Sequence, residues 1–443
     1  MASTYLTRTP SSTGNQRTFT FSFWVKRGGL SSQQHIYCQS YGSEDYQFRM
    51  EFTSSDEFRL YNSKGASDAI NLKTNRKFRD TSSWYAITIA IDTTQGTEAN
   101  RAKIYVNGVQ ETSFATATYP TQNLEMDANA GVAQLIGVQY KGNYDRYFDG
   151  SLSHFHFIEA TQYQASDFGE TDSTSGIWKP KTAPSVTYGT NGYFLKMENS
   201  GAMGTDSSGN SNTFTVSGTL TQNVDTPSNN FATMNTLIRS SNGTFASGNN
   251  KFTTSGGAWG SGFATLGMFN GGGKYYMEFK GASGTKIAYG ISDFKSSGVI
   301  QRTEAGETRY CGEYANSYAY HYGGNFYYSG SSTSTGYDSF TSSNVIGMAV
   351  DMDNLKIYFH KDGNYQDSKN PASNNGYTIV APEGVYLPTI TVEDAGATVN
   401  FGNGVFDTTA VASAGTAPSG GGIFEHDCPS GYQALCTKGI NSF

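Results

Sequence analysis

The most restrictive feature of the sequence is a pair of adjacent stretches in which apolar and polar residues alternate. Residues 344–351 read Asn-Val-Ile-Gly-Met-Ala-Val-Asp, and residues 355–360 read Leu-Lys-Ile-Tyr-Phe-His. Successive side chains of a strand point to opposite faces of its sheet, so each stretch predicts a strand with one apolar face. The polar residues Asp351-Met-Asp-Asn354 between them favour a turn. The pattern therefore predicts a β-hairpin whose aliphatic face is buried.

A similar pattern occurs much earlier in the chain. Tyr85–Asp92 alternates in the same way, and Lys103–Val109 follows it after a polar connection. The composition agrees with strands and tight turns, because 52 Gly, 30 Tyr and 28 Phe stand beside only 15% charged residues. We find no helical period sustained over 12 or more residues. A chain of 443 residues has room for two to three domains. We therefore predict an all-β protein with two β-sandwich domains.

The first half of the chain contains further strand signals. Thr18–Val25 reads Thr-Phe-Thr-Phe-Ser-Phe-Trp-Val and places three phenylalanines on one face. The other strands that we expect in this half are separated by turn residues, as a sandwich requires. They are Gln34–Gln39, Tyr46–Phe52, Glu57–Tyr61, Trp84–Asp92, Lys103–Val109, Ala133–Val138 and Gly150–Ile158.

Charge and targeting signals exclude some classes of function. The net charge is −7 and no cluster of Lys and Arg stands out, which argues against nucleic acid as a partner. The first ten residues lack the apolar segment of a secretory signal, and no apolar run reaches membrane-spanning length. We therefore expect no signal peptide and no membrane insertion. For Cys428 and Cys436, free thiols, a disulfide and a zinc site with His426 remain open.

Two parts of the chain resemble known families. The phrases FTFSFWVKR, WYAITIAID, KIYVNGVQ and YFDGSLSHFHFIEA resemble the laminin-G-like branch of the concanavalin A-like lectin/glucanase superfamily, over about residues 15–170. GGGKYYMEFKG, IAYGISDF, NVIGMAVDMDNLKIYFHKDG and YLPTITVEDAGATVNFGNGVF resemble a SPRY domain, over about residues 250–407. Both resemblances imply concanavalin A-like jelly-roll sandwiches, a fold that hosts lectins, enzymes and adhesion modules.

We divide the chain accordingly. Residues 1–170 would form the laminin-G-like sandwich and residues 250–410 the SPRY-like sandwich. Residues 171–249, rich in Ser, Gly and Asn, would be a connector with short strands, and residues 411–443 a Gly-rich tail.

The pairing of these domains, with the phrases TDSSGNSN, TPSNNFATMN and PSGYQALCTKGI, resembles virion proteins of tailed bacteriophages. The resemblance implies a place on the particle surface, in a tail fibre, a tail appendage or a head decoration. It also implies other virion proteins as partners, a homo-oligomeric state and a host-surface glycan as the target.

The set of residues that hydrolysis requires is incomplete in this sequence. The superfamily's glucanases carry a Glu-x-Asp-x-x-Glu motif, whose carboxylates stand ~5–5.5 Å apart in retaining enzymes. Glu125-Met-Asp127 lacks the second Glu, and Asp351-Met-Asp353 falls in the predicted turn. We therefore expect no catalytic residues and no enzyme.

His154 and His156 share a strand face, but a third metal ligand cannot be named. We interpret them as a solvated or packed pair and expect no metal or cofactor.

Exposed aromatic residues are the candidates for binding. Tyrosine combines a flat apolar ring with a hydroxyl, so it suits both sugar stacking and protein contacts. The alternative is that the alternating tyrosines form a strand that faces its own core or a neighbouring subunit. Three functions follow: a glycan-binding virion protein, a glycosidase or depolymerase, and a purely architectural protein. The candidate ligand-binding residues are Trp259, Tyr310, Tyr314, Tyr318, Tyr320, Tyr322, Tyr327 and Tyr328.

Overall fold

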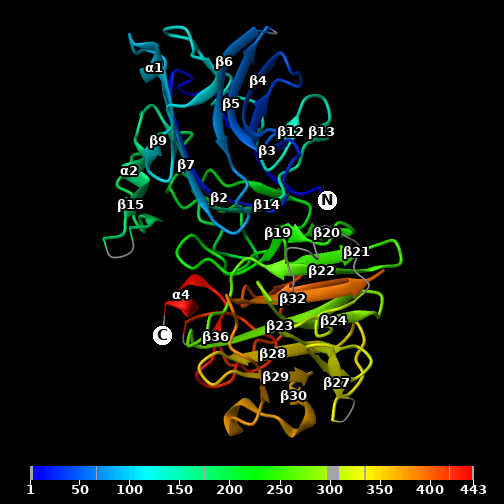
Figure 1. Ribbon diagram of the computed structural model, residues 1–443. Helices are drawn as coiled ribbons and strands as arrows, with labels where there is room; N and C mark the ends of the chain where they lie inside the picture. The colour runs from blue at the N-terminus through cyan, green and yellow to red at the C-terminus, as the bar shows by residue number, and fades with distance from the viewer. Residues whose placement is uncertain are drawn as a thin grey trace. The chain divides into compact units, whose positions relative to one another are not determined.

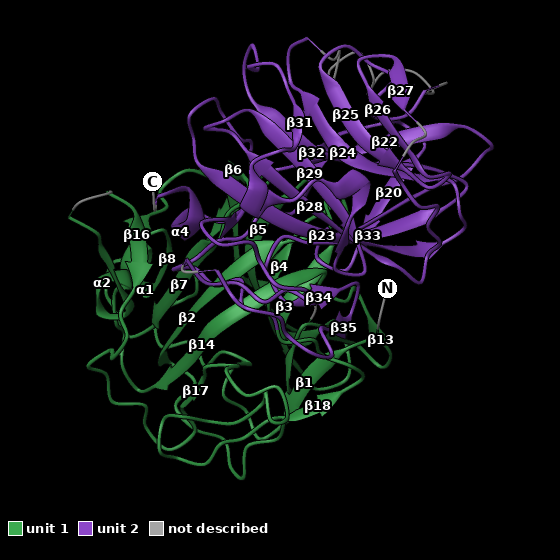
Figure 2. Ribbon diagram, turned by 90° about the horizontal axis from the view of Figure 1, so that it is seen from below, with its two compact units in different colours: residues 1–222 green, residues 223–443 purple. Residues whose placement is uncertain are grey.

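The computed structural model describes residues 3–65, 67–173, 176–296, 309–333, 336–418 and 420–441. Strands dominate it (Figure 1). The chain divides into two compact units, residues 1–222 and 223–443, which Figure 2 colours separately. The prediction of an all-β protein is confirmed. The helical segments in the described ranges are single turns: α1 (Glu98–Arg101), α2 (Ala165–Phe168), η1 (Gln366–Ser368), η2 (Pro371–Ser373) and α4 (Thr437–Ile440).

Within the described residues, no helix has the length and apolar character needed to cross a membrane.

Unit 1 contains two large sheets. The eight-stranded sheet has the order β10 (Phe114–Thr118), β6 (Ser67–Lys77), β5 (Glu57–Lys64), β4 (Tyr46–Phe52), β3 (Gln34–Ser40), β11 (Gln134–Ile136), β1 (Tyr5–Arg8) and β18 (Thr215–Ser217). The six-stranded sheet has the order β17 (Tyr193–Leu195), β14 (Gly150–Glu159), β2 (Thr18–Arg27), β7 (Tyr85–Asp92), β8 (Ala102–Val106) and β9 (Val109–Gln110). Two small pairs complete it: β12 (Gln139–Tyr140) with β13 (Tyr144–Asp145), and β15 (Gly169–Thr171) with β16 (Trp178–Pro180).

The core of unit 1 draws on both large sheets. Phe19, Phe21 and Phe23 of β2 are fully buried in it, as their spacing predicts. The predicted strands all appear, with ends shifted by a few residues at most. β6 was not predicted, because Ile70 and Leu72 are the main apolar residues among its eleven and the alternation is weak.

Unit 2 also contains two large sheets. The seven-stranded sheet has the order β19 (Met234–Arg239), β22 (Trp259–Ala264), β32 (Tyr386–Glu393), β24 (Ile287–Asp293), β25 (Ser317–His321), β26 (Asn325–Tyr328) and β27 (Ser331–Thr333). The nine-stranded sheet runs β20 (Gly243–Ala246), β21 (Lys251–Thr254), β33 (Gly396–Asn400), β23 (Lys274–Ser283), β28 (Val345–Asp351), β29 (Lys356–Lys361) and β30 (Asn364–Tyr365). In addition, β31 (Tyr377–Thr378) pairs with β29, and β36 (Gln433–Ala434) pairs in parallel with β23. A small pair joins β34 (Val405–Phe406) to β35 (Thr409–Ala410).

The predicted hairpin of unit 2 is formed by β28 and β29. Met348 pairs with Phe359 in an antiparallel register, and both side chains lie in the core. The opposite face of this hairpin is buried as well, because residues 424–436 near the C-terminus pack on Tyr358 and the strands around it. The stretch read as a Gly-rich tail therefore contributes a second apolar cluster on this face.

Residues 171–249 contribute strands to both units. β17 and β18 extend the two sheets of unit 1, whereas β19 and β20 lie at the edges of the sheets of unit 2. The domain boundaries at residues 170, 249 and 410 remain predictions.

Candidate functional site

A group of aromatic rings lies on one face of the seven-stranded sheet of unit 2. The core-facing residues of this sheet include Tyr289 and Tyr320, which are fully buried. Their neighbours along the strands point to the opposite face, because side chains alternate. We call the rings on this outer face the aromatic cluster, and each is half-buried: Trp259, Tyr310, His321 and Tyr327.

The rings of the aromatic cluster contact one another closely. Tyr310 lies at its centre: its ring stacks on His321 at 4.5 Å between centroids and meets Trp259 at 4.9 Å. The ring of Tyr327 meets Tyr310 edge-on at 4.9 Å. Tyr322 lies 4.3 Å from His321 but packs against the core, like Tyr320. Such pairs stabilise each other by about 0.5–1.5 kcal/mol beyond their buried area. The cluster is therefore ordered before any ligand binds.

A glycine makes this arrangement possible. Gly312 has φ of +98°, and a Cβ atom at this position would lie 2.4 Å from the Cβ of Tyr327. Only glycine combines this backbone conformation with so close an approach. Next to it, Cys311 is fully buried on the outer face of the sheet, and its backbone N–H donates to Thr391 Oγ1 at 3.2 Å. These two residues hold the segment that carries Tyr310 against the sheet.

His321 is a neutral hydrogen-bonding group within the cluster. Burial lowers the pKa of His321 to about 4, so its ring is uncharged at neutral pH. The backbone N–H of Gly323 donates to His321 Nδ1 at 3.2 Å. The proton of the neutral ring therefore belongs on Nε2, which can donate to a ligand.

A charged pair lies at the rim of the aromatic cluster. Trp259 pairs in register with Glu393 of β32, and Lys286 Nζ contacts Glu393 Oε1 at 2.6 Å. Lys286 is about half exposed. Apolar rings with a few directed polar groups beside them are the usual composition of a site for small ligands.

The other candidate tyrosines lie outside this arrangement. Tyr318 and Tyr320 are buried in the core, and their hydroxyls bond the backbone at Val380 N (3.1 Å) and Asp338 O (2.5 Å). Tyr328 is 39% exposed and stacks on Phe326. Tyr314 is half-buried and its backbone N–H donates to Ser317 Oγ.

The structure thus brings three of the eight candidates together, Trp259, Tyr310 and Tyr327, and adds His321. Tyr322 packs against the core instead. The signal for His321 was its place at a strand end, two residues before Gly323 and Gly324 of the turn.

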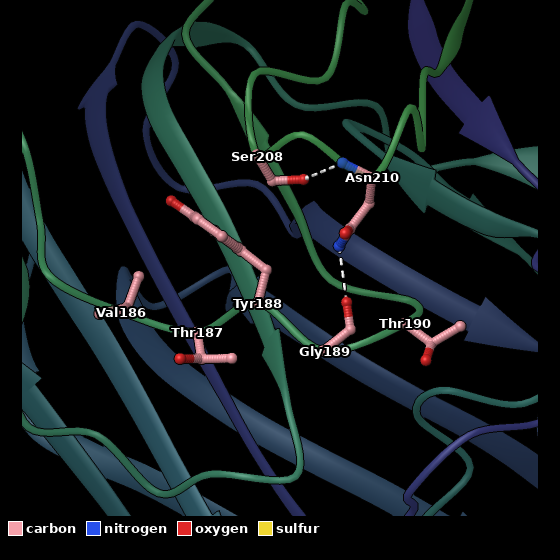
Figure 3. Close-up of a pocket in the computed structure, with 7 residues that line it drawn as sticks. All are labelled: Val186, Thr187, Tyr188, Gly189, Thr190, Ser208 and Asn210. Carbon is pink, nitrogen blue, oxygen red and sulfur yellow. Dashed lines mark hydrogen bonds between the residues drawn. The ribbon is translucent and has the colours of Figure 1, made fainter.

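Unit 1 contains a shallow pocket of about 520 Å³ (Figure 3). Asn210 crosses it, donating from its side-chain amide to the carbonyl of Gly189 at 2.6 Å and from its backbone N–H to Ser208 Oγ at 3.2 Å. Its aromatic residue, Tyr188, already shares a hydrogen bond with buried His156 at 2.9 Å. The pocket therefore offers less aromatic surface than the cluster in unit 2. Its lining residues are Val186, Thr187, Tyr188, Gly189, Thr190, Ser208 and Asn210.

The carboxylates considered for hydrolysis have other partners. Glu125 is exposed and forms an ion pair with Arg17 at 3.0 Å. Asp127 is buried and accepts a hydrogen bond from Asn62 Nδ2 at 2.8 Å, while burial raises the pKa of Asp127. Asp351 forms an ion pair with Lys274 at 2.9 Å. These contacts give each group a structural role, and the absence of enzyme activity remains a prediction.

The two histidines of β14 do not share one regular face. The strand pairing shifts between Ser153 and His156, and His154 has φ of +48°. His156 is buried and stacks on Phe194 at 3.9 Å, so it is a packed residue. Across the described ranges, no group of three or more His, Cys, Asp or Glu side chains could hold a metal ion.

The four cysteines are buried with free thiols in the structure. Cys428 and Cys436 belong to the apolar cluster on the β28–β29 hairpin.

Comparisons with known proteins agree with the two sandwiches. Residues 2–162 match the family described as the Concanavalin A-like lectin/glucanases superfamily, and residues 274–404 match the SPRY domain family. A search of the curated proteins finds no match to this chain.

Similar solved structures align with parts of the chain. A human SPRY domain is 16% identical over 34% of this chain and 90% of its own, with a TM-score of 0.27. A heptameric SAP-like pentraxin from Limulus polyphemus is 16% identical over 36% of this chain and 71% of its own, with a TM-score of 0.27. The CBM40 of a Ruminococcus gnavus IT-sialidase, bound to α2,3-sialyllactose, is 14% identical over 30% of this chain and 72% of its own, with a TM-score of 0.23. Residues 2–162 are thus similar to concanavalin A-like lectin/glucanase domains, and residues 274–404 to SPRY domains.

Proposed function

We propose that this protein binds carbohydrate, without hydrolysing it, through the aromatic cluster of unit 2. The observation that carries the proposal is a set of half-exposed rings that order one another and adjoin polar groups. A pyranose ring has an apolar C–H face and a rim of hydroxyls. It can therefore stack on Trp259 or Tyr310 while its hydroxyls bond His321 Nε2–H, Lys286 and Glu393. The match of residues 2–162 to a lectin/glucanase superfamily supports a carbohydrate function.

The test is a glycan array probed with the full chain displayed on a multivalent carrier, because individually weak sugar contacts gain from multivalency. Trp259→Ala removes one ring, and we expect it to weaken binding by about tenfold or more, which corresponds to ~1.4 kcal/mol. Phe269→Ala is the matched control, because Phe269 is an exposed aromatic residue of unit 2 outside the cluster. Equal binding by wild type and W259A would contradict the proposed site. An array on which the protein binds no glycan would contradict the carbohydrate proposal and favour a purely architectural function.

The hydrolase alternative has a separate test. Incubating the bound polysaccharide with the full chain and measuring new reducing ends would detect cleavage. We expect none, because the carboxylates considered above are engaged in ion pairs or hydrogen bonds.

We further propose that the protein acts as a homo-oligomer on the surface of a tailed-bacteriophage particle, next to other virion proteins, and attaches it to host glycans. The support is the sequence resemblance of TDSSGNSN, TPSNNFATMN and PSGYQALCTKGI. Mass spectrometry of purified particles, followed by immunogold labelling, tests this placement. Failure to find the chain in particles would contradict it and leave the carbohydrate proposal intact.

A further inference from the structure

Unit 1 carries a second group of stacked aromatic rings that the proposed function does not use. Tyr144, at the start of β13, is 45% exposed. Its ring stacks on Tyr5 at 4.9 Å with 22° between the planes, and it meets Tyr140 at 4.9 Å. The ring of Tyr147 lies 6.5 Å from Tyr5. We call these four residues the tyrosine patch.

The tyrosine patch rests on a rigid base. Tyr5, Tyr140 and Tyr147 pack partly buried against a small apolar cluster of Cys38, Leu135 and Val138. A hydrogen bond with Tyr5, together with partial burial, raises the pKa of Tyr144 to about 12. Rings held by such contacts lose little side-chain entropy when a ligand binds.

The charges around the patch neutralise one another. Lys141 Nζ contacts Glu44 Oε1 at 2.9 Å and Asp145 Oδ2 at 3.4 Å. Arg146 donates to Gln139 Oε1 at 2.7 Å and lies 3.9 Å from Glu44 Oε1. Two cations and two anions thus surround the rings, so the surface favours no strongly charged ligand. The same groups provide hydrogen-bond donors and acceptors at its rim.

The patch draws on segments that lie far apart in the sequence. The β12–β13 hairpin lies beside β3 in Figure 1, and a Cβ atom at Gly142 would lie 3.6 Å from the carbonyl oxygen of Gly42 in the β3–β4 turn. Tyr5 comes from β1, which pairs with β11. Residues distant in the sequence therefore form one surface.

We propose that the tyrosine patch is a second carbohydrate-binding site, for a neutral chain of pyranose sugars. The ordered rings match the apolar faces of successive sugars, and the balanced ion pairs match their uncharged hydroxyls. Because three of the four rings are partly buried, their exposed surface falls short of the ~800 Å² that each partner buries in a standard protein interface, which disfavours a protein partner. This site rests on residues that differ from those of the aromatic cluster, so each can fail without the other.

The experiment uses the full chain and a panel of neutral hexasaccharides: cello-, laminari-, malto-, manno-, xylo- and chitohexaose. Nitration of Tyr144 by peroxynitrite, whose radical route does not require the phenolate, reports whether its ring is covered when it is read by peptide mass spectrometry relative to other exposed tyrosines. A hexasaccharide present at twice its Kd occupies two thirds of the sites, so it should slow nitration of Tyr144 about threefold. We expect this slowing in wild type and in Trp259→Ala alike.

Saturation-transfer NMR on the same oligosaccharide provides the variant series. Tyr144→Ala should weaken binding by about tenfold, whereas Tyr144→Phe, which keeps the ring, should stay within about twofold of wild type. Because Tyr144 is exposed, we expect both variants to fold as wild type does, and circular dichroism checks this.

Three results would overturn the inference. One is unchanged nitration of Tyr144 with every hexasaccharide up to about 10 mM, a concentration that would detect even weak binding. Another is protection that disappears in Trp259→Ala, because the ligand would then act through the aromatic cluster. The third is nitration that speeds up on dilution without sugar, which would show that a second copy of the chain covers the patch. By contrast, loss of array binding in W259A concerns the proposed function alone.

Discussion

Glu278 of β23 anchors the C-terminal segment of unit 2, and its titration should make the stability of this unit depend on pH. Its side chain is fully buried. One oxygen accepts the backbone N–H of Glu425 and the other that of His426, each at 2.7 Å. Tyr276 Oη donates to it at 3.0 Å and in turn contacts His360 Nε2 at 2.6 Å. The carboxyl group thus connects residues 425 and 426 to the sheet.

Burial raises the pKa of Glu278 from its ordinary 4.5 to about 7, although the hydrogen bonds from Glu425, His426 and Tyr276 act in the opposite direction. The folded state therefore binds this proton more tightly than the unfolded chain does. The corresponding stabilisation is fully present below pH 4.5 and is lost as pH rises through 7. At about 1.4 kcal/mol per pH unit, the interval amounts to on the order of 3 kcal/mol. Burial lowers the pKa of His360 to about 3 and that of His321 to about 4, so these two rings add stability as pH rises through the same interval. We therefore expect the fall due to Glu278, up to about 3 kcal/mol between pH 5 and pH 8, as a difference between wild type and a variant that lacks the carboxyl group.

Urea unfolding at both pH values, with pulsed hydrogen exchange and mass spectrometry, assigns each transition to peptides of one unit. Glu278→Gln removes the titrating carboxyl group, so between pH 5 and pH 8 the unfolding free energy of E278Q should rise relative to that of wild type by up to that amount. His426→Gln is the matched control, because it changes the neighbouring ring that lies 5.1 Å from His360 and keeps the carboxyl group. It should retain the pH dependence of wild type. An unfolding free energy of unit 2 that changes equally with pH in E278Q and in wild type would refute this prediction.

Two further predictions concern single positions. Gly312→Ala should destabilise unit 2 by more than ~2 kcal/mol and weaken sugar binding, because its Cβ would clash with Tyr327 at φ of +98°. Gly330→Ala, at φ of +85° with its nearest contact at 3.6 Å, should show only the backbone strain of ~1 kcal/mol, and equal losses in urea unfolding would contradict the clash. Glu51→Gln should destabilise unit 1 by ~3–5 kcal/mol, because it leaves two buried or half-buried arginines and His35 without their anion. Although burial opposes it, the hydrogen bond from His35 and the nearby positive charges lower the pKa of Glu51 to about 2, so its stabilisation is present above pH 4.5 and is lost as pH falls towards 2. An unfolding free energy of unit 1 that depends on pH below 4.5 equally in E51Q and wild type would contradict this.

The strands were predictable because alternation is a local property. Thr18–Val25 and the hairpin of β28 and β29 contain their own signal, since one face must be apolar wherever a sheet covers a core. β6 was not predicted, because most of its eleven residues are polar. The burial of both faces of β29 was not predicted either, because the residues that cover its second face, 424–436, lie far along the chain.

The sequence by itself determined that the chain folds into sheets and that aromatic residues gather between residues 310 and 328. Only the tertiary structure decided which of them are accessible. Tyr320 and His321 are neighbours in sequence, yet the first lies in the core and the second joins Tyr310 on the outer face. Trp259 reaches this group because β22 pairs with β32, which pairs with β24 and through it with β25. The reason is physical: period-two alternation assigns side chains to two faces, but the order in which distant strands pair decides what each face meets.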